Sequence, residues 1–191
     1  WKACALGQGL FRGYIEEDFS VVWKQAEDNL KKARELNEND FEVHRLMSEV
    51  TLAMKDFRAA QRHSKLAYDM VPNDPRVLSV YGDVCVRTGK VDEGVDALKL
   101  ALDLDPIPQG KTNADPRHAG LLFAYYMSRD KDGCLEQIGH LDEIDVRSWL
   151  ITTKICSDEE HDYENLDWFK EGKKLFADKD WDKVVPDFRL N

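Results

Sequence analysis

Apolar positions in the centre of the chain recur with helical spacing, and the same pattern is written twice. They are Leu46, Met47 and Val50 in the first stretch, and Leu78, Tyr81 and Cys85 in the second. Residues three and four apart share one face of a helix, so each stretch predicts an amphipathic helix with a polar outer side. Pro72 and Pro106 close the two stretches, because proline ends a helix before itself.

The two stretches form an internal repeat. Phe41 and Pro75 are equivalent starts, 34 residues apart, and each stretch holds two helical runs with a turn between them. Small residues occupy equivalent places in both, namely Ser48 and Gly82 in the first runs and Ala60 and Gly94 in the second. Two antiparallel helices approach closely only where small side chains meet, so the repeat predicts tightly packed helix pairs.

This pattern resembles the tetratricopeptide repeat. The residues that carry the resemblance are Met47-Ser48, Phe57, Ala60, Ala67 and Pro72 in one unit, and Tyr81-Gly82, Gly89, Gly94, Ala101 and Pro106 in the next. The resemblance implies an all-α, right-handed α-solenoid of helix-turn-helix repeats, with an atypical helical cap at the C-terminal end.

More divergent units flank the central pair. We expect one domain, residues 1–191, whose units span about 1–38, 41–74, 75–106 and 115–144, followed by an atypical pair at 145–176 and a tail at 177–191. Within these, Ala26, Leu30 and Ala33 have core spacing, and helices are expected over 145–156 and 163–176. Aromatic residues gather near the C-terminal end, namely Trp149, Trp168, Phe169, Phe176, Trp181 and Phe188. They either plug the last core or meet a neighbouring domain or a second copy in a homodimer.

Composition restricts the class of partner. The chain has 27 Lys and Arg against 37 Asp and Glu, a net charge of −10, which repels nucleic acid and anionic lipid surfaces. No apolar run reaches the ~18 residues of a membrane span. The four cysteines, at 4, 85, 134 and 156, are too dispersed for a disulfide framework and predict buried reduced thiols in a cytoplasmic protein. Because residue 1 is not Met, we expect a piece of a longer chain.

Motifs for catalysis or cofactor binding are missing from the sequence. The glycines of residues 7–13 have the wrong spacing for a dinucleotide loop, and the five histidines form neither HxxxH nor HExxH. No spacing singles out a nucleophile with its base. We therefore expect a protein that is not an enzyme and that uses no cofactor or metal.

The first helices of such repeats line a concave groove in this family, so their unpacked positions are the candidate binding site. These positions are Gln8, Phe11, Arg12, Arg45, Glu49, Leu52, Ser79, Asp83, Val86, Arg87, Phe123, Tyr126 and Met127. The hypothesis is that Phe123, Tyr126 and Met127 anchor a protein or peptide while the arginines pair with its acidic groups. The alternatives are that Arg45–Glu49 and Asp83–Arg87 only stabilise their own helices, and that the tail covers the aromatic residues.

A nearer resemblance concerns the repeat regions attached to bacterial class III adenylate and guanylate cyclases. It is carried by ALGQG followed by GY near the start, by LDLDPIP, and by AYYMSRDKDGCLEQIGHL. It implies a regulatory segment of a larger signalling protein, and no catalytic residue is carried over. The expected function is thus a non-catalytic scaffold that binds proteins or peptides. The alternative is an effector-binding regulatory domain that holds a small ligand in the groove.

Overall fold

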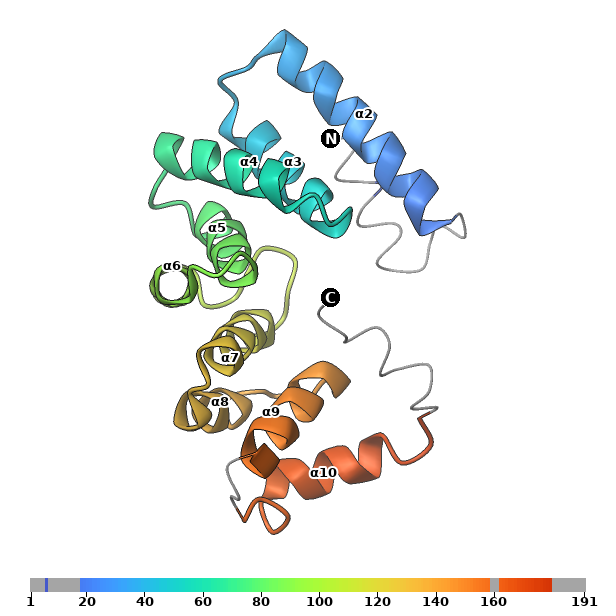
Figure 1. The fold of residues 1–191 in the computed structure, drawn as a ribbon, viewed down its shortest axis with the longest axis vertical. Coiled ribbons are helices and arrows are strands. Elements are labelled where there is room, and N and C mark those ends of the chain that lie inside the picture. The colour runs from blue at the N-terminus through green and yellow to red at the C-terminus, as the bar shows by residue number, and fades with distance from the viewer. Residues whose placement is uncertain (1–5, 7–17, 159–161, 180–191) are drawn as a thin grey trace. The chain divides into compact units, whose positions relative to one another are not determined.

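The computed structural model of the chain describes Leu6 and residues 18–158 and 162–179, and these residues are helical with short connections (Figure 1). The helices are α2 (Phe19–Leu36), α3 (Phe41–Ala53), α4 (Phe57–Met70), α5 (Pro75–Arg87), α6 (Val91–Leu104), α7 (Asp115–Ser128), α8 (Lys131–Ile138), α9 (Val146–Asp158) and α10 (Asp167–Leu175). The expected all-α fold of paired helices is confirmed.

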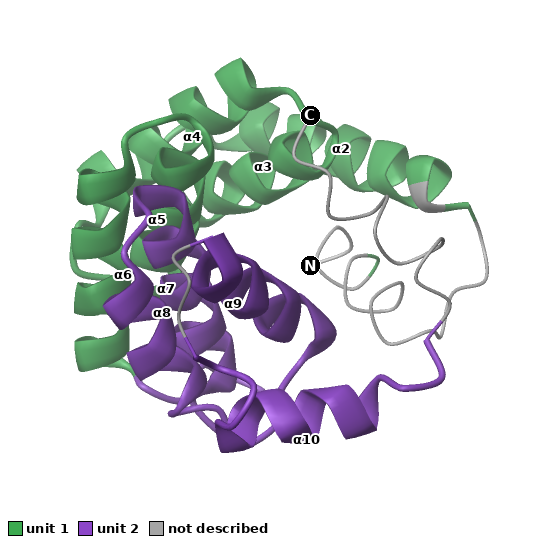
Figure 2. Ribbon diagram, turned by 60° about the horizontal axis from the view of Figure 1, so that its bottom comes forward, with its two compact units in different colours: residues 1–105 green, residues 106–191 purple. Residues whose placement is uncertain are grey.

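The chain forms two compact units, residues 1–105 and 106–191, which Figure 2 shows in different colours. In the first unit the described helices pack in chain order, and α5 contacts α3, α4 and α6. In the second unit α9 contacts α7, α8 and α10. The expected division into six segments within one domain stays a prediction.

Aspartate side chains begin most of the helices. Asp40, Asp56 and Asp74 precede α3, α4 and α5, and each carboxylate accepts a backbone N–H of the first turn. Such caps satisfy donors that have no partner inside the helix. The turn between the helices of a pair recurs as well, because Lys55 and Gly89, which are 34 residues apart, both have positive φ. The repeat thus extends to the backbone conformation of the turn.

The predicted crossing of small residues is confirmed in both central pairs. A Cβ atom added to Gly82 would lie 2.9 Å from the carbonyl oxygen of Gly94. A Cβ atom added to Gly94 would lie 2.8 Å from the carbonyl oxygen of Gly82. In the preceding pair, buried Ser48 donates a hydrogen bond of 3.1 Å to the carbonyl of Ala60. The backbones of the two helices therefore touch where the sequence places its smallest side chains.

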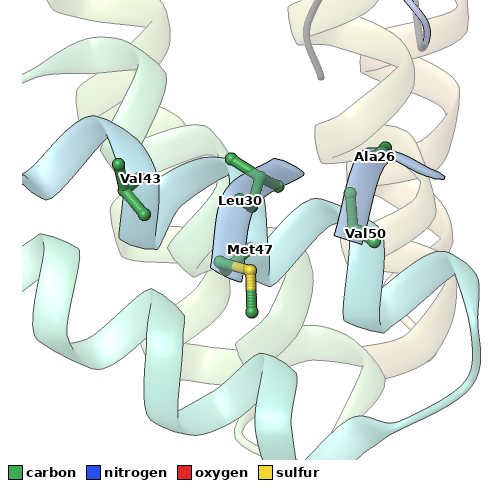
Figure 3. Close-up of a cluster of buried hydrophobic side chains, with 5 residues drawn as sticks. All are labelled: Ala26, Leu30, Val43, Met47 and Val50. Carbon is green, nitrogen blue, oxygen red and sulfur yellow. The ribbon is translucent and has the colours of Figure 1, made fainter. Parts of the chain in front are cut away.

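Apolar side chains fill the space between successive helices of the first unit. Ala26 and Leu30 of α2 pack against Val43, Met47 and Val50 of α3 (Figure 3). The next cluster joins Leu78, Tyr81 and Cys85 of α5 to Ala97 and Ala101 of α6. Five of the six residues that the helical spacing selected are buried in these clusters, and Leu46 packs half-buried against the first one, so the predicted core of the central repeats is confirmed.

Tyr81 connects three helices. Its ring stacks on that of Tyr68 in α4, with centroids 4.4 Å apart, and its hydroxyl donates a hydrogen bond to the carboxylate of Glu93 in α6. Burial and this carboxylate raise the pKa of the phenol. A single side chain of α5 thereby joins the second helices of two successive repeats.

The second unit uses glycine in the same way. A Cβ atom at Gly133 would lie 2.6 Å from the ring of Tyr125, and one at Gly172 would collide with the indole of Trp149. The last pair differs from the sequence prediction, since α10 begins at Asp167 rather than at residue 163. A turn closed by the hydrogen bond from Leu166 N–H to the Tyr163 carbonyl, 3.0 Å, precedes it.

The C-terminal aromatic residues pack on one another. Phe169 and Phe176 lie against the buried indole of Trp149, whose Nε1 donates to the Phe169 carbonyl at 3.3 Å, and Trp168 packs edge-on against Phe169. Trp181 and Phe188 lie outside the described residues. A plug of the last core describes the four placed side chains, while contact with a second copy or a neighbouring domain through this region stays a prediction.

A pair of buried histidines joins α3 to α4. The Nδ1 atoms of His44 and His63 are 3.0 Å apart, and His44 Nε2 lies 2.9 Å from the carbonyl oxygen of Glu38. A carbonyl accepts, so His44 Nε2 donates, and in its neutral form His44 Nδ1 accepts from His63 Nδ1. This chain of hydrogen bonds requires at least one of the two rings to be neutral.

Acid should destabilise the first unit through this pair. Burial is the main cause that lowers the pKa of His63 to about 4, and His44, Arg62 and Arg34 add to it. The pKa of histidine in an unfolded chain is about 6.5, so between pH 6.5 and 4 the unfolded state binds more protons than the folded state. The stability of the folded state therefore decreases as the pH is lowered through this range. When the pH is lowered from 7.5 to 4.5, the unfolding free energy of the parent chain should decrease by about 2 kcal/mol more than that of the His63→Leu variant. Urea denaturation at the two pH values measures both decreases. Equal losses in both proteins would contradict this assignment.

The glycine crossing gives a second prediction. Alanine is the better helix former, yet Gly82→Ala should reduce the unfolding free energy by about 1 to 2 kcal/mol, because its Cβ meets Gly94 and Leu98. The control Gly139→Ala, whose Cβ would come no closer than 3.3 Å to a neighbouring atom, should change it by less than about 1 kcal/mol. Urea denaturation of both variants tests this, and a stabilised Gly82→Ala protein would show that the helices do not cross there.

Candidate functional site

A half-exposed surface runs along the first helices of the first unit. It consists of Arg45, Glu49 and Leu52 of α3 with Ser79, Asp83 and Arg87 of α5, and is called the first-helix face below. α3 and α5 contact each other directly, so residues from two repeats contribute to it. Val86 was expected on this surface, and that prediction is wrong. It is fully buried, because it fills the space beside Gly94 at the crossing of α5 and α6.

Arg45 is the centre of a charged network on α3. Its Nε and NH2 atoms donate to both carboxylate oxygens of Glu42 at 3.0 and 2.7 Å, and its NH1 donates to Glu49 at 2.8 Å. The Arg45 side chain is only 11% exposed, whereas that of Glu49 is 42% exposed. Hydrogen bonds from Arg45 hold the pKa of Glu42 below its ordinary value. The guanidinium is thus engaged by the protein itself.

The network extends from α3 to α5. Arg76 NH1 lies 3.5 Å from the Glu42 carboxylate, and Arg76 NH2 lies 2.7 Å from the Asp74 carboxylate that caps α5. Further along α5, Arg87 Nε donates to Asp83 at 2.9 Å. The ion pairs Arg45–Glu49 and Arg87–Asp83 therefore form, as the alternative interpretation of the sequence expected. Each contributes a few tenths of a kcal/mol in an exposed setting, on the order of 0.3–0.5.

Glu49 differs from Glu42 in the direction of its pKa shift. Burial raises its pKa, the nearby charges of Glu42 and Asp83 act in the same direction, and Arg45 opposes them. Its side chain is nevertheless accessible to solvent. Glu49 is thus an accessible carboxyl group whose burial and carboxylate neighbours oppose the effect of Arg45, so a second cation placed beside it would be stabilising.

The remaining predicted site residues lie elsewhere. In the second unit Phe123 is buried, and the Arg147 guanidinium lies over its ring at 4.3 Å. The expectation that Phe123 is an exposed anchor is therefore wrong. Tyr126 and Met127 of the same helix are partly exposed. Three further candidates, Gln8, Phe11 and Arg12, lie outside the described residues. The structure therefore brings together the candidates of α3 and α5.

Sequence reasoning missed Glu42 and Arg76, which link the two repeats of the first-helix face. Both lie in the first turn of their helices and are 34 residues apart, so the repeat alignment places them in equivalent positions. The signal that could have found them is their opposite charge at one repeat position. Charges of this kind can pair between neighbouring repeats.

Other titratable groups do not form a metal centre in the described part of the chain. No group of three or more His, Cys, Asp or Glu side chains there is arranged to hold a metal ion. His118 Nδ1 donates a hydrogen bond of 2.8 Å to Gln137 Oε1, and the His118 ring stacks on that of His140. Three cysteines, Cys85, Cys134 and Cys156, are buried free thiols as expected, and Cys4 lies outside the described residues. None of the described helices has both the length and the apolar character of a membrane span.

Comparison with solved structures identifies the architecture. The tetratricopeptide-repeat protein MamA has 13% sequence identity and a TM-score of 0.63, and the match covers 86% of this chain and 100% of MamA. Pseudomonas aeruginosa PilF has 16% identity and a TM-score of 0.63, with 97% and 90% covered. The chain therefore has a fold of the tetratricopeptide-repeat type. No family profile and no curated protein matches the sequence.

Removing Arg45 should change both neighbouring carboxyl groups. In Arg45→Gln the pKa of Glu42 and that of Glu49 should rise, because the guanidinium lowers both. Carboxyl chemical shifts followed by NMR titration measure this directly. The control Lys65→Gln, which removes the partner of Asp69 on α4, should leave both values unchanged. A lower pKa of Glu49 in Arg45→Gln would contradict the network.

Proposed function

We propose that the chain is a non-catalytic interaction module whose first-helix face binds a segment of a partner protein that carries Lys or Arg. The observation that supports this most strongly is the accessible carboxylate of Glu49. It accepts a hydrogen bond from Arg45 and stands near Asp83 on the adjacent repeat, and burial together with the neighbouring carboxylates disfavours its charged form, which a further cation would stabilise. Folds of stacked helix pairs offer such faces to extended peptides and helices.

The proposed polarity is opposite to that expected from the sequence. Arg45 and Arg87 were expected to pair with acidic groups of a partner, but each is already paired with a carboxylate of its own helix. An acidic segment would have to break these pairs and would meet Glu49 and Asp83. A basic segment leaves them intact. The side chain of Leu52 on α3 provides an apolar contact on the same face.

The wider setting is part of the same proposal. The module acts as a regulatory or recruiting segment of a cytoplasmic signalling protein, as the resemblance to cyclase repeat regions implies. Its net charge of −10 favours basic partners at a distance as well. Tyr126 and Met127, on α7 of the second unit, are proposed as candidate contacts of that unit by itself.

Peptide binding tests the proposal. Fluorescence anisotropy with a short peptide of alternating Lys and Ala should show saturable binding, and the peptide with Glu in place of Lys should bind at least tenfold more weakly, a difference of about 1.4 kcal/mol. The double variant Glu49→Gln/Asp83→Asn should bind the basic peptide roughly tenfold more weakly than the parent chain. Added salt should weaken it too, because the contacts are ionic and exposed.

A matched control separates the site from the overall charge. The double variant Asp103→Asn/Asp132→Asn removes the same charge from two exposed positions on α6 and α8 and should bind like the parent. If both double variants weaken binding equally, the peptide responds only to net charge and the site is wrong. Preference for the acidic peptide would overturn the proposed polarity.

A further inference from the structure

Exposed apolar residues occur at repeat-equivalent positions of two second helices. Leu66 of α4 and Leu100 of α6 are 34 residues apart and are 38% and 39% exposed. One turn further on, Met70 and Leu104 are again 34 residues apart and again exposed. Both helices contact α5 in the first unit. Exposed apolar side chains thus recur in one register on two successive hairpins, and water disfavours exposed apolar area of this kind.

Charges beside these residues invert between the two helices. Arg58 and Arg62 precede Leu66 on α4, whereas Asp92 and Asp96 stand at the equivalent positions of α6. All four are exposed, and within the described part of the chain none of them forms an ion pair. Lys65/Lys99 and Asp69/Asp103 are alike in both helices and do not distinguish them. Glu93 of α6, whose equivalent on α4 is Ala59, is engaged by Tyr81 and Lys90 of its own chain.

We propose that this second-helix face, made of α4 and α6, binds a second copy of the chain. In a two-fold symmetric dimer, if one residue contacts another across the interface, the reverse contact forms too. Placing α4 of one copy against α6 of its partner brings Arg62 to Asp96 twice, and Leu66 to Leu100 twice. Placing α4 against α4 would bring like charges together. The inverted charges therefore select the crossed arrangement.

The second-helix face is separate from the proposed peptide site. The first-helix face lies on α3 and α5, and the dimer contacts lie on α4 and α6, so one chain can make both interactions. A dimer would present two first-helix faces, and a partner with two basic segments would then bind with avidity. The dimer stands or fails independently of peptide binding.

Charge reversal with rescue by mixing tests the arrangement. Sedimentation velocity of the full chain over a concentration series should show a reversible monomer–dimer equilibrium. Arg62→Asp alone and Asp96→Arg alone should each raise the dissociation constant by roughly tenfold or more, because two ion pairs become like-charge contacts. An equimolar mixture of the two variants should dimerise like the parent. In the mixed dimer, one contact joins the introduced aspartate to the introduced arginine, and the other keeps the native pair of Arg62 with Asp96.

Further variants give the expected and opposing outcomes. Leu66→Ser should also shift the chain towards monomer while its melting temperature stays within a few degrees of the parent, since the side chain is exposed. Lys173→Asp, a charge reversal on α10, should leave the equilibrium unchanged. A chain that is monomeric at every concentration, or a mixture of the two reversal variants that stays monomeric, would overturn the proposal.

Discussion

The close approach of α5 and α6 at Gly82 and Gly94 is the constraint on which the first unit depends. The backbone oxygens of these residues lie where added Cβ atoms would collide, so no other residue type can stand there without moving a helix. That contact fixes the angle of the helix pair. It also directs Tyr81 between Tyr68 and Glu93 and leaves Asp83 and Arg87 on the accessible side of α5.

Periodicity predicted the fold of the central repeats well because it reports local physics. Helix faces, proline ends, aspartate caps and small crossing residues are each written within one or two turns of the chain. The terminal pair was less predictable. Residues Tyr163 to Leu166 were expected to be helical and instead form a turn, since that stretch lacks a repeat partner against which its register can be read.

The candidate site was only partly accessible to sequence reasoning. Helical spacing placed Arg45, Glu49, Asp83 and Arg87 on one face, but it could not say which charges would be used within the protein. Ion pairing depends on side-chain reach across two helices, as Arg76 and Glu42 show. Val86 was predicted on the wrong side because it lies at the edge of its helix face. Gly94 on the opposite helix has no side chain, so the Val86 side chain packs into the space beside it at the helix crossing.

Two faces of one hairpin stack thus carry different chemistry. The first helices α3 and α5 present the carboxylates Glu49 and Asp83, each paired with one arginine of its own helix. The second helices α4 and α6 present exposed apolar residues beside charges that are positive on α4 and negative on α6. Both depend on α5 being held in place by its neighbours α3, α4 and α6. Native-state hydrogen exchange tests this most directly. The amides in the middle of α5 should exchange more slowly than those of α2 and open together with those of α6. Exchange of α5 as fast as that of α2, or independent of α6, would contradict it.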